Sequence, residues 1–207
     1  IAKGGDLTRM FAELFGRETG YCHGRGGSMH IADLSLGILG ANGIVGGGIP
    51  LVVGAAYAHQ RQGNRRVSVA FFGDGAVNQG AFHESLNLAA AWQLPVLFVC
   101  ENNGYAATVP QTKHQRQQEI SLRAVGYGMP GVTIDGNDAL AVYEVSREAV
   151  ERARSGGGPT LIECKTYRHY PHAGLGGDSR PADEVTGWMT CDPLKHLANL
   201  LDAISDD

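Results

Sequence analysis

Two apolar runs that each lead into a polar side chain constrain the fold of this 207-residue chain more than any other feature. The first run, residues 67–72, leads into Asp74, and the second, residues 95–100, leads into Asn103, which lies 29 positions after Asp74. Continuous apolar runs of this length are typical of strands buried on both faces of a parallel sheet. Because helical patterns separate the runs, we expect an α/β fold, with a doubly wound, mainly parallel sheet and helices on both faces.

The polar residues at the ends of the two runs predict a metal site. Ligands of such sheets bind at the carboxyl ends of the strands, where Asp74 would place a carboxylate and Asn103 an amide oxygen. Mg²⁺ takes about six oxygen ligands in near-octahedral order and keeps some of its water. Gly73 and Gly75 permit a sharp turn, and we expect the helix that follows to point its free amides at phosphate. The pattern therefore predicts a site for a magnesium-bridged diphosphate.

The remaining pattern extends the same alternation over a single domain, residues 1–207. Further strands are expected at 132–134 and 160–165, and helices at 7–15, 50–62, 81–92, 116–127, from 137 or 138 to 154, and after 192. Candidate helix caps are Asp6, Asn137 or Asp138, and Asp192.

Two irregular regions complete the expected domain. Residues 16–48 contain 11 glycines, a density that weakens regular structure and indicates a loop packed against a ligand or another chain. Residues 168–191 are expected to form an active-site loop and the connection to the last helix.

Composition excludes several classes of partner. The formal net charge is −4 and no Lys/Arg cluster stands out, so we expect binding neither to nucleic acid nor to an anionic membrane. The longest uncharged apolar stretch, residues 49–58, is far shorter than the roughly 20 residues of a membrane span. No signal-peptide pattern is seen, and we expect a cytoplasmic protein that binds a small-molecule substrate and other proteins.

Gly-Asp-Gly after a strand is by itself often an ordinary turn. A nicotinamide-binding motif would need Gly-x-Gly-x-x-Gly, but position 78 is Asn and the third glycine arrives only at Gly80. The second polar strand end, Asn102-Asn103, favours the diphosphate site over both alternatives.

With this pair of motifs the chain resembles thiamine-diphosphate-dependent enzymes, whose cofactor motif is Gly-Asp-Gly, a spacer and then Asn-Asn. It is most similar to the alpha subunit of the two-chain E1 component of 2-oxo acid or acetoin dehydrogenases. The matching runs are residues 24–30, 41–46, 73–80 and 101–105. The likeness extends from about Ala2 to Arg168.

The resemblance implies a set of cofactor contacts. The magnesium ligands would be Asp74, Asn103 and the backbone carbonyl of Tyr105. The diphosphate would meet the amides of Gly75 and Ala76, and the aminopyrimidine would contact Gly43 and Val45. Ordinary core packing is the alternative for Val45. Asn102 is expected to be structural rather than a ligand.

His172 falls where the family has a loop histidine that contacts the reacting intermediate. Such a side chain can donate to a developing oxyanion or orient a proton, although an exposed loop histidine with no role is the alternative. The loop departs from the family, with Pro171 in place of the usual glycine and Ala173 in place of a frequent serine. That serine is phosphorylated in some relatives, so we expect this regulation to be absent.

The resemblance also implies the reaction and the partners. The cofactor would cleave a C–C bond of acetoin or pyruvate, and the acyl fragment would pass to a lipoyl group on an E2 protein. An E1 beta subunit in an α2β2 assembly would supply the glutamate that protonates the aminopyrimidine. The chain opens after the Tyr-Arg segment that holds the diphosphate in relatives. A truncated, noncatalytic remnant that keeps only the fold and oligomer contacts is therefore the alternative.

Overall fold

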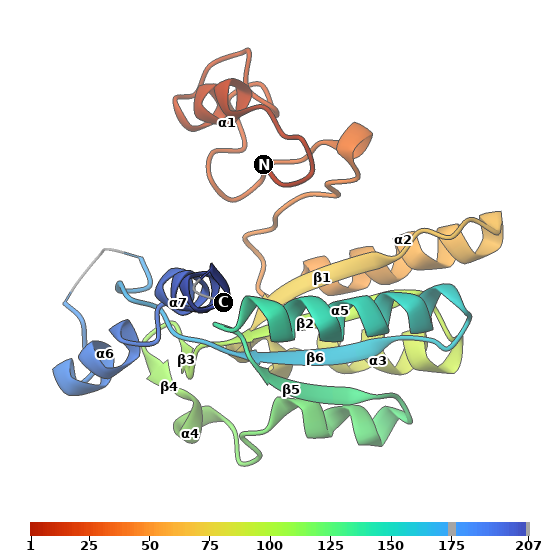
Figure 1. Cartoon of the computed structure of the whole chain (residues 1–207). Coiled ribbons are helices and arrows are strands. Elements are labelled where there is room, and N and C mark those ends of the chain that lie inside the picture. Colours follow the sequence, from red (N-terminus) through yellow and green to blue (C-terminus); the bar gives the residue numbers. More distant parts are fainter. Residues whose placement is uncertain (174–176, 206–207) are drawn as a thin grey trace.

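The chain forms a four-stranded parallel sheet, shown in Figure 1, in a computed structural model that describes residues 1–173 and 177–205. The order across the sheet is β1-β2-β6-β5. The strands are β1 Ser68–Gly73, β2 Val96–Asn102, β6 Thr160–Lys165 and β5 Gly131–Asp135. All three neighbouring pairs are parallel, which confirms the expected mainly parallel α/β fold.

Helices cover both faces of the sheet, as a doubly wound fold requires. On one face the main core joins the sheet to α2 Gly48–Gln62, α3 Gly80–Ala91 and the 3₁₀ helix η3 Ile120–Tyr127. On the other face a smaller core joins β2 and β6 to α5 Ala139–Arg154. Side chains alternate between the two cores along β2, where Phe98 faces the first and Leu97 the second.

Aspartate caps begin three helices at the expected positions. Asp6 accepts from the amide of Thr8 at 2.7 Å and begins α1 Leu7–Leu14. Asp138, rather than Asn137, accepts from two amides and begins α5. Asp192 accepts from the amide of Leu194 at 2.8 Å, next to α7 Pro193–Ser205. These contacts satisfy amides that the first turn of a helix leaves without partners.

Several local predictions were wrong. Strand β1 is not buried on both faces, because α5 packs over the other three strands and leaves Val69 and Phe71 at 37% and 69% exposure. The turn after β1 contains an unexpected 3₁₀ helix, η2 Asp74–Asn78, whereas α3 Gly80–Ala91 agrees with the helix expected at 81–92. In place of the helix expected at 116–127, the 3₁₀ helix η3 begins only at Ile120, and a short helix, α4 Gln111–His114, precedes the expected range.

Four short elements were not expected from the sequence pattern. They are η1 Leu34–Leu36, the antiparallel pair β3 Tyr105–Ala106 and β4 Val109–Pro110, and α6 Ala182–Met189. The pair β3–β4 and α6 lie beside the carboxyl ends of the parallel strands in Figure 1. No helix in the described part of the chain is both long enough and apolar enough to cross a bilayer.

The glycine-rich region is irregular, as expected, and is organised around one carboxylate. Glu13 of α1 is 1% exposed and accepts from four backbone amides at 2.6 to 3.1 Å. The donors are the amides of Cys22, Gly24, Gly26 and Gly27. Burial opposes this charge, but the four hydrogen bonds together lower the pKa of Glu13. Figure 1 shows α1 and the N-terminus standing apart from the sheet.

The main core yields a test of the fold with a matched control on the same helix. Leu86 of α3 is fully buried in the main core, whereas Leu88 is 37% exposed. We expect Leu86→Ala to lower the free energy of unfolding by about 2 to 5 kcal/mol, through lost burial and the cavity left behind. Leu88→Ala should cost about 1 kcal/mol or less. Urea unfolding of both variants checks this, and equal losses would contradict the packing of α3.

Candidate functional site

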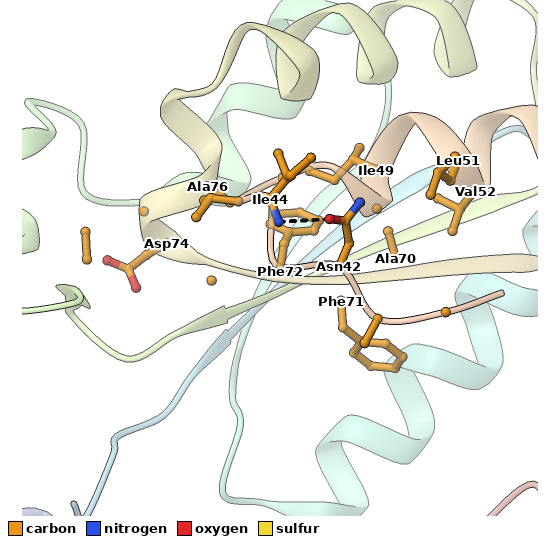
Figure 2. Close-up of a pocket in the computed structure, with 18 of the residues that line it drawn as sticks. Asn42, Ile44, Ile49, Leu51, Val52, Ala70, Phe71, Phe72, Asp74 and Ala76 are labelled. Carbon is orange, nitrogen blue, oxygen red and sulfur yellow. Dashed lines mark hydrogen bonds between the residues drawn. The ribbon is translucent and has the colours of Figure 1, made fainter. Parts of the chain in front are cut away.

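A cavity of about 770 Å³ lies at the carboxyl ends of β1 and β2. Its walls come from the end of the glycine-rich region, the start of α2, β1 with its following turn, and residues 103–107. The lining includes every predicted site residue except Gly43, namely Val45, Asp74, Gly75, Ala76, Asn103, Tyr105 and His172. Figure 2 shows Asp74 at the tip of β1, with Phe71 and Phe72 earlier on the strand and Asn42 and Ile44 from the loop.

Asp74 is a buried carboxylate without a hydrogen-bond donor. The residue is 1% exposed, and no donor in residues 1–173 or 177–205 hydrogen-bonds to either carboxylate oxygen. Burial raises the pKa of the Asp74 carboxyl, and the nearby backbone amides of Asp74 and Asn103, together with attraction by His114, oppose this shift only in part. A buried charge of this kind is costly unless it is paired or binds a metal. The two orphaned oxygens therefore fit a cation held in the cavity.

His114 is a further polar side chain beside Asp74, and the sequence analysis did not identify it. Its Nε2 lies 3.6 Å from Oδ2 of Asp74. Asn78 accepts from Arg123 through Oδ1 and turns its Nδ2 to Nδ1 of His114 at 3.1 Å. The neutral imidazole therefore carries its proton on Nε2, facing Asp74. No spacing signal marks His114, because it lies 40 positions after Asp74, with α3 and β2 between them.

The two asparagines at the end of β2 point to different surroundings. Asn102 is 3% exposed, donates to Glu163 at 2.7 Å and accepts from the amide of Gly104 at 3.0 Å. These contacts agree with the structural role expected for Asn102. Asn103 lines the cavity, and its Oδ1 accepts from the amide of Tyr105 at 3.1 Å. An amide oxygen has a second lone pair, so Oδ1 of Asn103 can also meet a cation.

A buried network of hydrogen bonds holds the carboxyl ends of β1 and β2 in place. Glu163 of β6 is fully buried, and although burial opposes its charge, hydrogen bonds from Lys165, Ser121 and Asn102 lower its pKa. Gln115 donates to the backbone carbonyl of Asp74 at 2.8 Å. The network thus fixes the main chain at Asn102 and at Asp74, and with it the direction of the side chains above.

Close backbone approach explains one glycine of the motif. A Cβ added to Gly75 would lie 2.8 Å from Cβ of Ala106, nearer than side-chain carbons come in proteins. Gly75 therefore lets the turn after β1 lie directly against β3, which carries Tyr105. Gly43 is different, because its neighbours are His30 and Met29 rather than the cavity. Gly43 is itself not a lining residue, although its chain neighbours Asn42 and Ile44 are.

The unpaired carboxylate predicts an unusual effect on stability. In the absence of metal, Asp74→Asn should raise the free energy of unfolding at pH 7, by on the order of 1 kcal/mol, because it removes a buried charge. The gain should shrink as the pH falls through the raised pKa, where the wild-type carboxyl becomes neutral.

Chemical unfolding in EDTA measures this effect. Glu101→Gln is the control, because Glu101 is an exposed carboxylate at the end of β2 and lies outside the cavity lining. A variant Asp74→Asn less stable than the wild type would mean that the carboxylate already has a stabilising partner.

Comparisons with known proteins identify the family of this chain. The family model described as "Dehydrogenase E1 component" matches residues 1–205. The alpha subunit of acetoin:2,6-dichlorophenolindophenol oxidoreductase from Bacillus subtilis is 61% identical over 172 residues, 83% of this chain and 52% of the relative. The corresponding subunit from Cupriavidus necator is 55% identical over 172 residues, again 83% of this chain and 52% of the relative.

A more distant relative and a solved structure also match the chain. The alpha subunit of the pyruvate dehydrogenase E1 component from Porphyra purpurea is 43% identical over 205 residues, 95% of this chain and 60% of the relative. A solved structure, a putative thiamin diphosphate-dependent enzyme from Mycobacterium smegmatis, is 27% identical with a TM-score of 0.48, over 63% of this chain and 24% of the other. The chain spans about half the length of the curated relatives it matches. By its match over residues 1–205, the chain belongs to the dehydrogenase E1 component family.

Proposed function

We propose that the chain is the alpha subunit of a thiamine-diphosphate-dependent E1 dehydrogenase, an oxidoreductase, and that it holds Mg²⁺ and the cofactor diphosphate. One observation carries the proposal: the buried carboxylate of Asp74, whose oxygens accept no hydrogen bond within the described residues, and the amide oxygen of Asn103 line the same cavity. A carboxylate and neutral oxygens are the ligands that Mg²⁺ prefers, with phosphate and water completing its shell. Family membership supports the choice of cofactor.

The site residues have separate roles in this proposal. Asp74, Asn103 and the backbone carbonyl of Tyr105 hold the magnesium ion, and the amides of Gly75 and Ala76 meet the diphosphate. Val45 is 60% exposed and lines the cavity, which favours cofactor contact over core packing for this residue. Gly43, which lies between the lining residues Asn42 and Ile44, contacts the aminopyrimidine together with Val45 in this proposal.

The chemistry divides between cofactor and chain. Thiamine diphosphate, when bound, supplies the nucleophile and electron sink for C–C cleavage. The chain binds and orients the diphosphate end, and the apolar wall around Phe71, once a partner covers it, excludes water from the cavity. His172 lies at the cavity and is an exposed loop residue, so its imidazole is free to donate to an oxyanion or orient a proton. Acetoin is the proposed substrate and pyruvate the alternative, following the names of the relatives.

An E1 beta subunit completes the proposed enzyme in an α2β2 assembly. The open face of β1, with Val69 and Phe71 exposed, leaves one apolar wall of the cavity for another chain to cover. The acyl fragment passes from this assembly to a lipoyl group on an E2 protein. We place the enzyme in the cytoplasm and treat residues 1–207 as one cofactor-binding domain.

Calorimetry with Mg²⁺ and thiamine diphosphate tests the proposed site. Asp74→Ala should abolish metal-dependent binding in the assembly with the beta subunit, because it removes the charged ligand, whereas Glu101→Gln should bind like the wild type. Unchanged binding by Asp74→Ala would show that this carboxylate is not a ligand.

The same titration separates the enzyme from a noncatalytic remnant. Heat of binding only in the presence of the beta subunit supports the enzyme. The absence of heat with and without the beta subunit supports a remnant that retains the fold and oligomer contacts alone.

A second test concerns His172. His172→Gln should lower kcat by about 10²- to 10⁴-fold, the range for loss of a general acid or base, and leave cofactor affinity within about threefold of the wild type. His169→Gln is the control, because His169 lies in the same loop but outside the cavity lining. Steady-state kinetics on acetoin and pyruvate provide the measurement, and equal kcat values for both variants and the wild type would exclude a chemical role for His172.

A further inference from the structure

The segment after β6 folds back onto the residue whose carbonyl is the proposed third metal ligand. The hydroxyl of Tyr105 donates to the carboxylate of Glu184 in α6, with its oxygen 3.0 and 2.9 Å from the two carboxylate oxygens. The contact joins residues 79 apart in sequence.

Aromatic rings extend this contact. Tyr167, directly before the loop that carries His172, stacks on Trp188 of α6 with ring centroids 5.3 Å apart and planes 2° from parallel. The ring of Tyr105 meets the ring of Tyr167 edge to face at 6.3 Å. Such pairs contribute beyond the area they bury, and they fix the rotation of each ring. Helix α6 is therefore attached to the cavity wall through two tyrosines.

A buried arginine ties together the two ends of the same loop. The side chain of Arg180 is 3% exposed, lies 4.9 Å over the ring of Tyr167 and pairs with Asp178 at 2.7 Å. Its guanidinium also donates to the backbone carbonyl of Arg168. Pairing with Arg180 lowers the pKa of Asp178 to about 2, so this pair is charged at neutral pH. The main chain on the two sides of His172 is thus linked at Arg168 and Arg180.

We infer that these five residues, Tyr105, Tyr167, Arg180, Glu184 and Trp188, form a clasp that positions the metal site and the His172 loop. The inference rests on the proposed function, because it assigns the clasp to the backbone carbonyl of Tyr105. That backbone is held on one side by Asn103, which accepts from the Tyr105 amide, and on the other by the clasp. A near-octahedral ion tolerates little displacement of a ligand, so release of the Tyr105 side chain weakens metal binding.

Two substitutions that each remove one partner of the Tyr105–Glu184 hydrogen bond test the clasp in the full-length alpha chain assembled with its beta partner. Tyr105→Phe removes the donor and keeps the backbone carbonyl, and Glu184→Ala removes the acceptor. Each should raise the calorimetric Kd for Mg²⁺, measured at saturating thiamine diphosphate, by about 10-fold, the loss expected for one hydrogen bond to a charged group. Glu184→Gln should restore most of the affinity, because its amide oxygen still accepts.

Hydrogen–deuterium exchange of the peptide spanning residues 103–110 gives a readout that does not depend on activity. Exchange in the metal-free assembly should be faster in Tyr105→Phe and Glu184→Ala than in the wild type and Glu184→Gln. Asp183→Asn is the control, because Asp183 is the neighbouring acid of α6, whereas the Tyr105 hydroxyl donates to Glu184.

The outcomes separate the clasp from the proposed function. If the wild-type assembly binds Mg²⁺ and both Tyr105→Phe and Glu184→Ala bind it equally well, the clasp is overturned and the proposed function stands. If the wild-type assembly itself shows no metal-dependent binding, the proposed function fails, and the clasp fails with it. If Glu184→Ala does not fold, Tyr105→Phe alone decides: unchanged Mg²⁺ affinity overturns the clasp, and an affinity lower by about 10-fold supports it.

Discussion

The meeting of two parallel strand ends at one edge of the sheet is the constraint from which the rest of the site follows. Register pairs Gly73 of β1 with Glu101 of β2, so the residues just beyond them, Asp74 and Asn103, enter the same cavity. Neither side chain needs a long or strained loop to reach its place. The Glu163 and Gln115 contacts below the edge then hold the main chain on which these side chains stand.

Two features of the site lower the stability of the folded chain when it is alone. The carboxylate of Asp74 is buried without a donor in the described part of the chain, and Phe71 beside it is 69% exposed. An unpaired buried charge and an open apolar wall both cost free energy in the isolated chain. A cation and a covering partner would remove these two costs together. The features that destabilise the chain alone are therefore those that the proposed assembly uses.

Local sequence patterns were sufficient for the parallel strands but not for the parts that depend on distant contacts. The limits of β6 and the caps at Asp6, Asp138 and Asp192 followed from local chemistry. The exposure of β1 could not be predicted, because Phe71 in an apolar run looks like any buried residue until the reach of α5 is known.

The site shows the same division. Asp74 and Asn103 were predictable because each directly follows a strand, whereas His114 and Glu184 reach the site only through tertiary contacts. The sequence of α6 shows no clear apolar face from which the helix could be predicted. The helix contacts the cavity wall through a hydrogen bond and a ring stack. Gly43 was assigned by resemblance alone; it is not a lining residue, but its neighbours Asn42 and Ile44 are.

The metal site is tested most directly by replacing magnesium with Mn²⁺ and locating that ion by anomalous scattering in crystals of the assembly grown with thiamine diphosphate. We expect one manganese ion bound by a carboxylate oxygen of Asp74, the side-chain oxygen of Asn103 and the carbonyl oxygen of Tyr105, each at roughly 2.1 to 2.2 Å. A manganese ion bound elsewhere, or one at this cavity that leaves Asp74 uncoordinated, would contradict the convergence of the two strand ends on a single cation.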